Sequence, residues 1–61
     1  MPDEPIRVGD VFRNVERPRR AWRVTAQLGE NVRLERVDQP SVVRFPLRKA
    51  LLDPHRYVRG G

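Results

Sequence analysis

The chain has 61 residues, with 13 basic and 8 acidic side chains, one histidine and no cysteine. This length allows a single domain, near the lower limit for folding without a metal ion or a disulfide. The lack of cysteine excludes disulfides and thiolate zinc sites, and no apolar run approaches the roughly 18 residues of a membrane span. We therefore expect a cytoplasmic protein that holds no metal and no cofactor and contacts no membrane.

The formal net charge is +5, and every basic residue except Lys49 is an arginine. So large a charge on so small a domain favours polyanionic partners such as nucleic acid. A GC-rich coding sequence is the alternative explanation for the arginine content. It does not account for the excess of positive over negative charge.

The chain opens with a short tail and a kinked strand. Residues 1–5 contain two prolines and little to bury, which predicts a mobile tail. Residues 6–12, IRVGDVF, are predicted to form the first strand, with a kink at Gly9 and Asp10. Its apolar anchors are Ile6, Val8 and either Val11 or Phe12.

Residues 21–28, AWRVTAQL, alternate between apolar and polar side chains. This period of two is typical of a strand that is buried on one face. The residues predicted to face inward are Trp22, Val24, Ala26 and Leu28. Trp22 is accordingly predicted in the core, with its indole nitrogen reaching the surface.

Two turns determine the predicted hairpin registers. Residues 29–31, GEN, are predicted as a three-residue turn, and Asp38 with Gln39 as a two-residue turn. Both registers keep apolar faces together. The expected pairs are Leu28 with Val32, Ala26 with Leu34, Leu34 with Val43, and Val32 with Phe45.

The second register places two arginines opposite each other on the outer face. Arg33 would face Arg44, and like charges across a ladder destabilise a sheet. Two interpretations stay open. Either Glu35 and solvent offset the repulsion, or the arginines form a platform for phosphate, with Gln27 beside them.

The last third of the chain predicts a strand, a helical turn and a final strand. Residues 41–47, SVVRFPL, form the strand, with Val43, Phe45 and Leu47 facing inward. Residues 47–53 are too few for an independent helix but suit one turn of α- or 3₁₀-helix. Residues 55–59 could form the last strand, and residues 59–61 are predicted as a frayed tail.

Four to five short strands with one helical turn before the last predict an all-β fold, a small antiparallel barrel over residues 6–58. The segments VGDVFR, VRLERVD and LRKALLDP resemble small bacterial SH3-like barrels of the KOW and Tudor type. The resemblance implies an SH3-like barrel and no specific active site. Members of that fold bind RNA, DNA, ribosomal surfaces or protein tails, so the fold leaves function open.

The loop between the first two strands carries concentrated positive charge. Five arginines and one glutamate lie between residues 13 and 23, and Pro18 stiffens the loop. Rigid scaffolds often present binding loops in this way, although a charged loop is also an ordinary protein surface. The predicted nucleic-acid-binding residues are Arg17, Arg19, Arg20, Arg23, Arg33 and Arg44.

Aromatic side chains near this loop are candidates for stacking on bases. Phe12 and Tyr57 are possible stacking residues, with core packing as the alternative for each. No catalytic constellation is visible, because His55 has no nucleophilic partner and the carboxylates are scattered. We therefore expect a protein that is not an enzyme.

The resulting prediction is a non-enzymatic module that binds DNA or RNA through phosphate contacts. The alternative is a protein–protein interaction or homo-oligomeric assembly module, because a small barrel has exposed strand edges. Four apolar residues could supply that contact surface: Val37, Val42, Leu51 and Leu52.

The C-terminal RYVRGG offers a further alternative, because it resembles the end of ubiquitin-like modifiers and sulfur carriers. Those proteins need a long helix after the first hairpin, where this chain has strand patterns. A single RGG motif for RNA binding is a third interpretation of Gly60 and Gly61.

Overall fold

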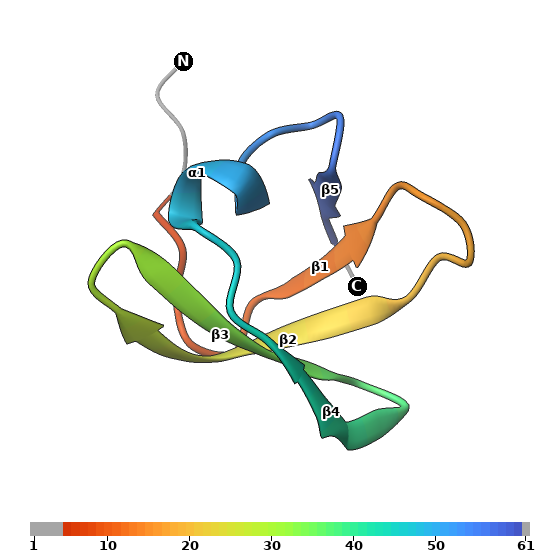
Figure 1. The fold of residues 1–61 in the computed structure, drawn as a ribbon, viewed down its shortest axis with the longest axis horizontal. Helices are drawn as coiled ribbons and strands as arrows, with labels where there is room; N and C mark the ends of the chain where they lie inside the picture. Colours follow the sequence, from red (N-terminus) through yellow and green to blue (C-terminus); the bar gives the residue numbers. More distant parts are fainter. Residues whose placement is uncertain (1–4, 61) are drawn as a thin grey trace.

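Five antiparallel strands form one sheet in the order β4-β3-β2-β1-β5, and the computed structural model describes residues 5–60 (Figure 1). The elements are β1 (Val11–Asn14), β2 (Ala21–Leu28), β3 (Asn31–Arg36), β4 (Gln39–Arg44), α1 (Arg48–Leu51) and β5 (Tyr57–Arg59). This all-β architecture, with one helical turn before the last strand, confirms the predicted small SH3-like barrel. The predicted mobile tail lies outside the described residues, except for Pro5.

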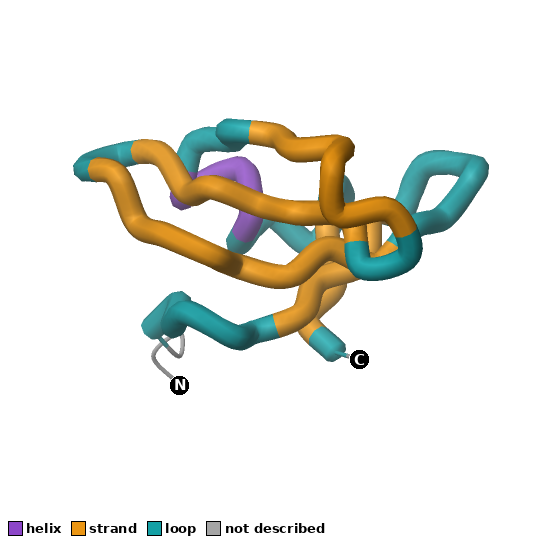
Figure 2. The backbone as a smooth tube through the Cα atoms, turned by 90° about the horizontal axis from the view of Figure 1, so that it is seen from below, coloured by secondary structure: helices purple, strands orange, loops and turns teal. Residues whose placement is uncertain are grey.

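The sheet bends around α1, so that the helical turn covers its inner face (Figure 2). Leu51 of α1 enters the core there and is 1% exposed. The other buried apolar residues are Ile6, Phe12, Trp22, Val24, Val32 and Leu34. Because Trp22, Val24, Val32 and Leu34 come from alternating positions, the period of two correctly predicted the centre of the core.

The β2–β3 hairpin turns one residue earlier than predicted. Gly29 adopts φ +63°, which permits a two-residue turn with Glu30 and pairs Leu28 with Asn31. The register then shifts between Val24 and Ala26, which brings Val24 opposite Leu34 on the inner face. The predicted pairs Leu28–Val32 and Ala26–Leu34 are therefore wrong, and Leu28 is 51% exposed.

The β3–β4 hairpin also differs from the prediction. The turn is formed by Val37 and Asp38, which pairs Arg36 with Gln39. The register then jumps from Gln39 to Val43 while β3 moves by one residue. Pro40 lies inside this irregular stretch and has no N–H to donate to a ladder.

This jump reverses the predicted faces of β4. Leu34 lies opposite Arg44, so Arg44 shares the inner face with Leu34, whereas Arg33 points to the outer face. The predicted opposition of Arg33 and Arg44 is therefore wrong. Phe45 and Leu47, predicted to face inward, are 53% and 41% exposed.

The two ends of the described chain differ from the prediction in smaller ways. Val8 is exposed rather than an anchor, because a turn at Val8 and Gly9 interrupts the segment before β1. Arg59 belongs to β5, and the Gly60 N–H donates to the Val11 carbonyl at 2.9 Å. These two residues therefore continue the sheet instead of fraying.

Helical structure is confined to α1 within residues 5–60. No helix in that part of the chain has the length and apolar character needed to cross a membrane. The long helix that a ubiquitin-like modifier needs after its first hairpin is absent there, since β2 connects directly to β3.

Candidate functional site

A buried asparagine shapes the loop that joins β1 to β2. The Asn14 side-chain oxygen accepts hydrogen bonds from the Arg20 backbone N–H and from the indole Nε1–H of Trp22, both at 2.9 Å. Its Nδ2 donates to the carbonyl oxygens of Glu16 and Pro18. Asn14 is 9% exposed, so its amide holds the loop to the sheet from the inside. The Trp22 nitrogen therefore ends on Asn14 and does not reach the surface as predicted.

This arginine loop, residues 15–20, forms one wall of an open groove of about 760 Å³. The groove follows the seam between the edge strands β4 and β5, which are not paired with each other. Five arginines line it: Arg17, Arg20, Arg36, Arg44 and Arg56. One glutamate, Glu16, lies among them, so the groove is strongly basic.

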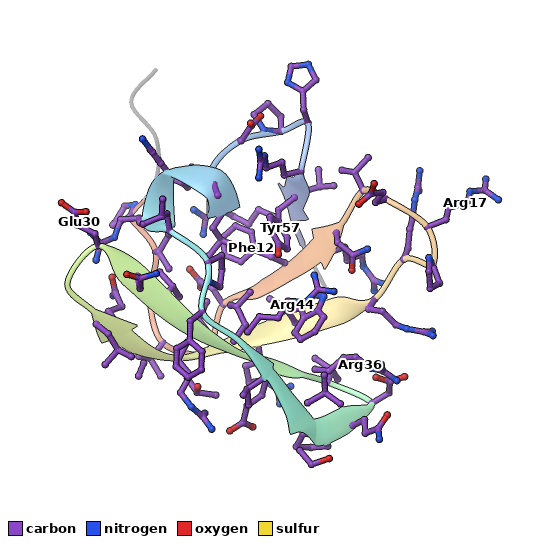
Figure 3. The ribbon with its side chains drawn as sticks, viewed as in Figure 1. Phe12, Arg17, Glu30, Arg36, Arg44 and Tyr57 are labelled. Atoms are coloured by element: carbon purple, nitrogen blue, oxygen red, sulfur yellow. The ribbon has the colours of Figure 1, made fainter. Side chains whose placement is uncertain are left out.

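Arg44 lies at the centre of the groove, stacked on an aromatic floor. Its guanidinium carbon is 4.4 Å from the centroid of the Trp22 ring, and its Nη1 donates to Tyr57 Oη at 3.5 Å. The second contact bridges the seam between β4 and β5, and Figure 3 shows Arg44 and Tyr57 close together. Arg44 is thus held by an aromatic face and a phenol, and its charge has no carboxylate partner among residues 5–60.

Two other groove arginines have carboxylate neighbours. Arg36 Nε lies 2.7 Å from Asp38 Oδ1, and Arg56 Nε lies 3.8 Å from Asp53 Oδ2. The hydrogen bond from Arg36 lowers the pKa of Asp38. The pKa of Asp53 is also lowered, mainly because the His55 backbone N–H donates to its carboxylate. Both acids therefore stay ionised at neutral pH and partly neutralise the groove beside Arg36 and beside Arg56.

Arg17 and Arg20 differ from these two. No carboxylate lies within ion-pair distance of either guanidinium in the described part of the chain. Arg17 projects from the far end of the arginine loop, and Arg36 lies near the β3–β4 turn on the same side of the molecule (Figure 3). These two guanidinium groups of the loop wall therefore lack the close carboxylate that Arg36 and Arg56 have.

The structure brings four of the predicted site residues to this groove: Arg17, Arg20, Arg44 and Tyr57. Arg19 shares the loop but not the groove, and its Nε donates to the Val15 carbonyl oxygen at 3.4 Å.

The remaining predicted residues lie elsewhere. Arg23 and Arg33 are on the outer face, where Arg33 Nη1 lies 2.7 Å from Glu35 Oε2. Phe12 is 2% exposed in the core, so its ring does not present a stacking surface. The arginine patch predicted from sequence is therefore split between two faces of the sheet.

Asn14, Arg36 and Arg56 line the groove but were not among the site residues predicted from the sequence. Asn14 interrupts the apolar alternation after Phe12, which is a signal for a buried polar group. Arg36 follows Leu34 by two positions and so shares its inner face. Arg56 carried no such signal, because its place depends on how residues 53–57 turn into β5.

In the described part of the chain, the acidic residues and His55 lie apart from one another, except near Asp53. Within residues 5–60, no three His, Cys, Asp or Glu side chains are grouped so that they could hold a metal ion. The His55 side chain is 93% exposed, with Nδ1 3.3 Å from Asp53 Oδ1.

Comparison of the chain with known protein families, curated proteins and solved structures finds no match.

Proposed function

We propose that this protein is a non-enzymatic module that binds nucleic acid through phosphate contacts in the basic groove. The observation that carries the proposal is the convergence of five arginines from four separate segments on one groove that contains a single glutamate. Guanidinium groups bind phosphate oxygens bidentately, and a polyanion relieves the mutual repulsion of clustered cations.

The proposed interface differs from the one predicted from sequence. It leaves out Arg19, Arg23 and Arg33 and adds Arg36 and Arg56, which line the groove. One nucleic-acid backbone cannot follow the groove and the outer face of the sheet together. The outer-face Arg33 is also occupied by Glu35 and by Thr25 Oγ1, which lies 2.7 Å from Arg33 Nη1.

The test is charge reversal of the loop wall with a matched control. The Arg17→Glu/Arg20→Glu variant should weaken binding to random DNA and RNA by about tenfold or more, measured by fluorescence anisotropy below about 200 mM salt. Arg7→Glu/Arg13→Glu makes the same change of net charge at exposed residues that do not line the groove. Equal losses in the two variants would show that net charge alone attracts nucleic acid, which would overturn the groove as the interface.

A second candidate function is protein–protein or homo-oligomeric assembly, favoured by an apolar patch at the other end of the sheet. Leu28, Phe45 and Leu47 are exposed and gather around Asn31, which pairs with Leu28, bridges to Leu47 and donates to the Phe45 carbonyl oxygen. Of the residues expected in such a surface, Leu51 is in the core, and Val42 and Leu52 are half-buried; only Val37 is exposed. A dimer in light scattering that Phe45→Ser dissociates would support this function, and a monomer at high concentration would argue against it.

A further inference from the structure

The centre of the groove has features that phosphate binding alone does not require. We propose that it is a seat for an unpaired base, so that the preferred ligand is single-stranded nucleic acid, with the base stacked on the Arg44 guanidinium beside Tyr57. This inference rests on the proposed function and adds the substrate class to it.

Two layers of the proposed stack, the Trp22 indole and the Arg44 guanidinium, are already in contact. The Arg44 guanidinium carbon lies 4.4 Å from the Trp22 centroid, so one face of the guanidinium is covered by the indole. Trp22 is 1% exposed whereas Arg44 is exposed, which leaves the second face of the guanidinium for the groove. Unpaired bases stack on arginine planes and on aromatic rings, and they would extend this stack by one layer.

Tyr57 makes the seat wider and fixes it in place. Its hydroxyl accepts a hydrogen bond from Arg44 Nη1 across the seam, and its ring is half-buried against the core. The cation is therefore restrained by the indole and the phenol before any ligand arrives. A restrained plane loses less conformational entropy on binding than a free arginine side chain would.

Phosphate-binding groups flank the seat on more than one side. Arg17 and Arg20 lie on the loop wall, Arg36 lies near the β3–β4 turn, and Arg56 precedes β5. A strand whose base enters the groove can thus place its neighbouring phosphates against different arginines. This arrangement, a basic channel with an aromatic stacking platform, is how proteins bind single strands.

The dimensions also favour a single strand. The open groove of about 760 Å³ falls in the range of about 300–1,000 Å³ that is typical of sites for small ligands. In a duplex both faces of each base are occupied by neighbouring bases, so no base could stack on Arg44 without leaving the helix. A duplex could reach only the arginines at the rim.

The experiment compares a single-stranded decamer with a hairpin duplex of the same number of phosphates, both by fluorescence anisotropy. The wild-type protein should bind the single strand roughly 5-fold or more tightly than the duplex, since stacking of one base contributes at this level. Arg44→Lys keeps the charge but removes the plane, and it should erase this preference while duplex affinity stays within about 2-fold. Arg13→Lys, an exposed strand position outside the groove, is the matched control and should change neither affinity.

A change in the ligand tests the same contact without altering the protein. A decamer with abasic sites in place of its central bases should bind wild-type protein about as weakly as the full decamer binds Arg44→Lys, and the two changes should not add. Equal affinity for single strand and duplex, or additive losses, would overturn the base seat. Loss of the groove dependence in the Arg17→Glu/Arg20→Glu comparison would instead overturn the proposed function, so the two failures are distinguishable.

Discussion

At the scale of single residues, Asn14 connects the core to the groove. Its side-chain amide makes four hydrogen bonds: Nδ2 donates to the carbonyl oxygens of Glu16 and Pro18, and Oδ1 accepts from N–H groups of Arg20 and Trp22. Both the Nδ2 and the Oδ1 atoms of Asn14 are thus hydrogen-bonded to other groups of the protein. This one buried amide thus holds the backbone of the arginine loop at three points.

Replacing Asn14 by alanine should lower the free energy of unfolding by about 1–3 kcal/mol, because buried N–H groups of Arg20 and Trp22 lose their acceptor. Urea unfolding measures this loss, and the Trp22 indole resonance in NMR spectra should shift in the same variant. Asn31→Ala is the control, since Asn31 makes one side-chain hydrogen bond, to the Phe45 carbonyl, and should cost less. Equal losses in both variants would contradict the role given to Asn14.

Asp38 limits the charge of the groove from outside it. Its carboxylate pairs with Arg36, so Asp38→Asn should free that guanidinium and tighten nucleic-acid binding about 2- to 5-fold. Glu30→Gln makes the same charge change at the opposite end of the molecule, where Figure 3 shows Glu30, and should have a smaller effect. A larger gain from Glu30→Gln would argue against this role.

The pH dependence of the Asp38 pair has a definite sign. The hydrogen bond from Arg36 lowers the pKa of Asp38 in the folded state below the unfolded value of about 3.9. The pair therefore contributes its stabilisation at pH values above the unfolded pKa and loses it as the pH falls through the folded pKa. An NMR titration of the Asp38 carboxyl should show a midpoint that rises in Arg36→Gln.

At the scale of strands and turns, the sequence predicted which elements exist better than how they pair. The alternation around Trp22 and Val24 is independent of turn length, and it correctly identified β2 and the inward-facing Trp22 and Val24. It wrongly placed Leu28 inward, because the register shifts after Val24. The predicted register of the β2–β3 hairpin was wrong because its turn has two residues instead of three. That of the β3–β4 hairpin was wrong because its turn begins one residue earlier. Either change moves every later pair of the ladder.

The faces of β4 show why this matters for the site. With the predicted turn, Arg44 belonged to the outer face beside Arg33; with the observed register it lies on Trp22. Pro40 signals an interruption of the ladder after Gln39, but neither it nor the residues around Val24 and Ala26 determine how far the register shifts. The sequence therefore predicted the arginine loop that forms one wall of the groove. It did not predict that Arg44 lies on Trp22 at the centre of the groove.

The β2–β3 turn can be tested at Gly29. Its φ of +63° lies in the left-handed region, and a Cβ added there meets no atom within 4 Å. Backbone conformation alone should therefore set the cost, with Gly29→Val losing about 1–2 kcal/mol of unfolding free energy and Gly29→Asn less. Urea unfolding of the two variants checks this, and identical losses would mean that the turn is not formed as described.

At the scale of the whole molecule, the arginines differ in whether a carboxylate lies beside them. On the outer face Arg33 pairs with Glu35, and at the sheet edge Arg59 pairs with Asp10 at 2.9 Å. In the groove, Arg17, Arg20 and Arg44 have no such carboxylate partner among residues 5–60. Three of the five groove arginines thus lie without an ion-pair partner in the described part of the chain.

This distribution predicts the salt dependence of binding. If about four phosphates are neutralised, log affinity plotted against log salt concentration should have a slope of about −3 for a single strand. The slope of Arg17→Glu/Arg20→Glu should be shallower by about 1–2, because two contacts are lost. A titration of wild-type binding that is flat between 50 and 200 mM salt would contradict an interface built on phosphate contacts.

The single tryptophan of the chain lies directly beneath the residue to which the ligand is assigned. Any molecule that presses on or displaces the Arg44 guanidinium alters the electric field at the indole, and hence its emission. The protein therefore carries an intrinsic optical reporter of occupancy, and unlabelled oligonucleotides can be screened against it directly.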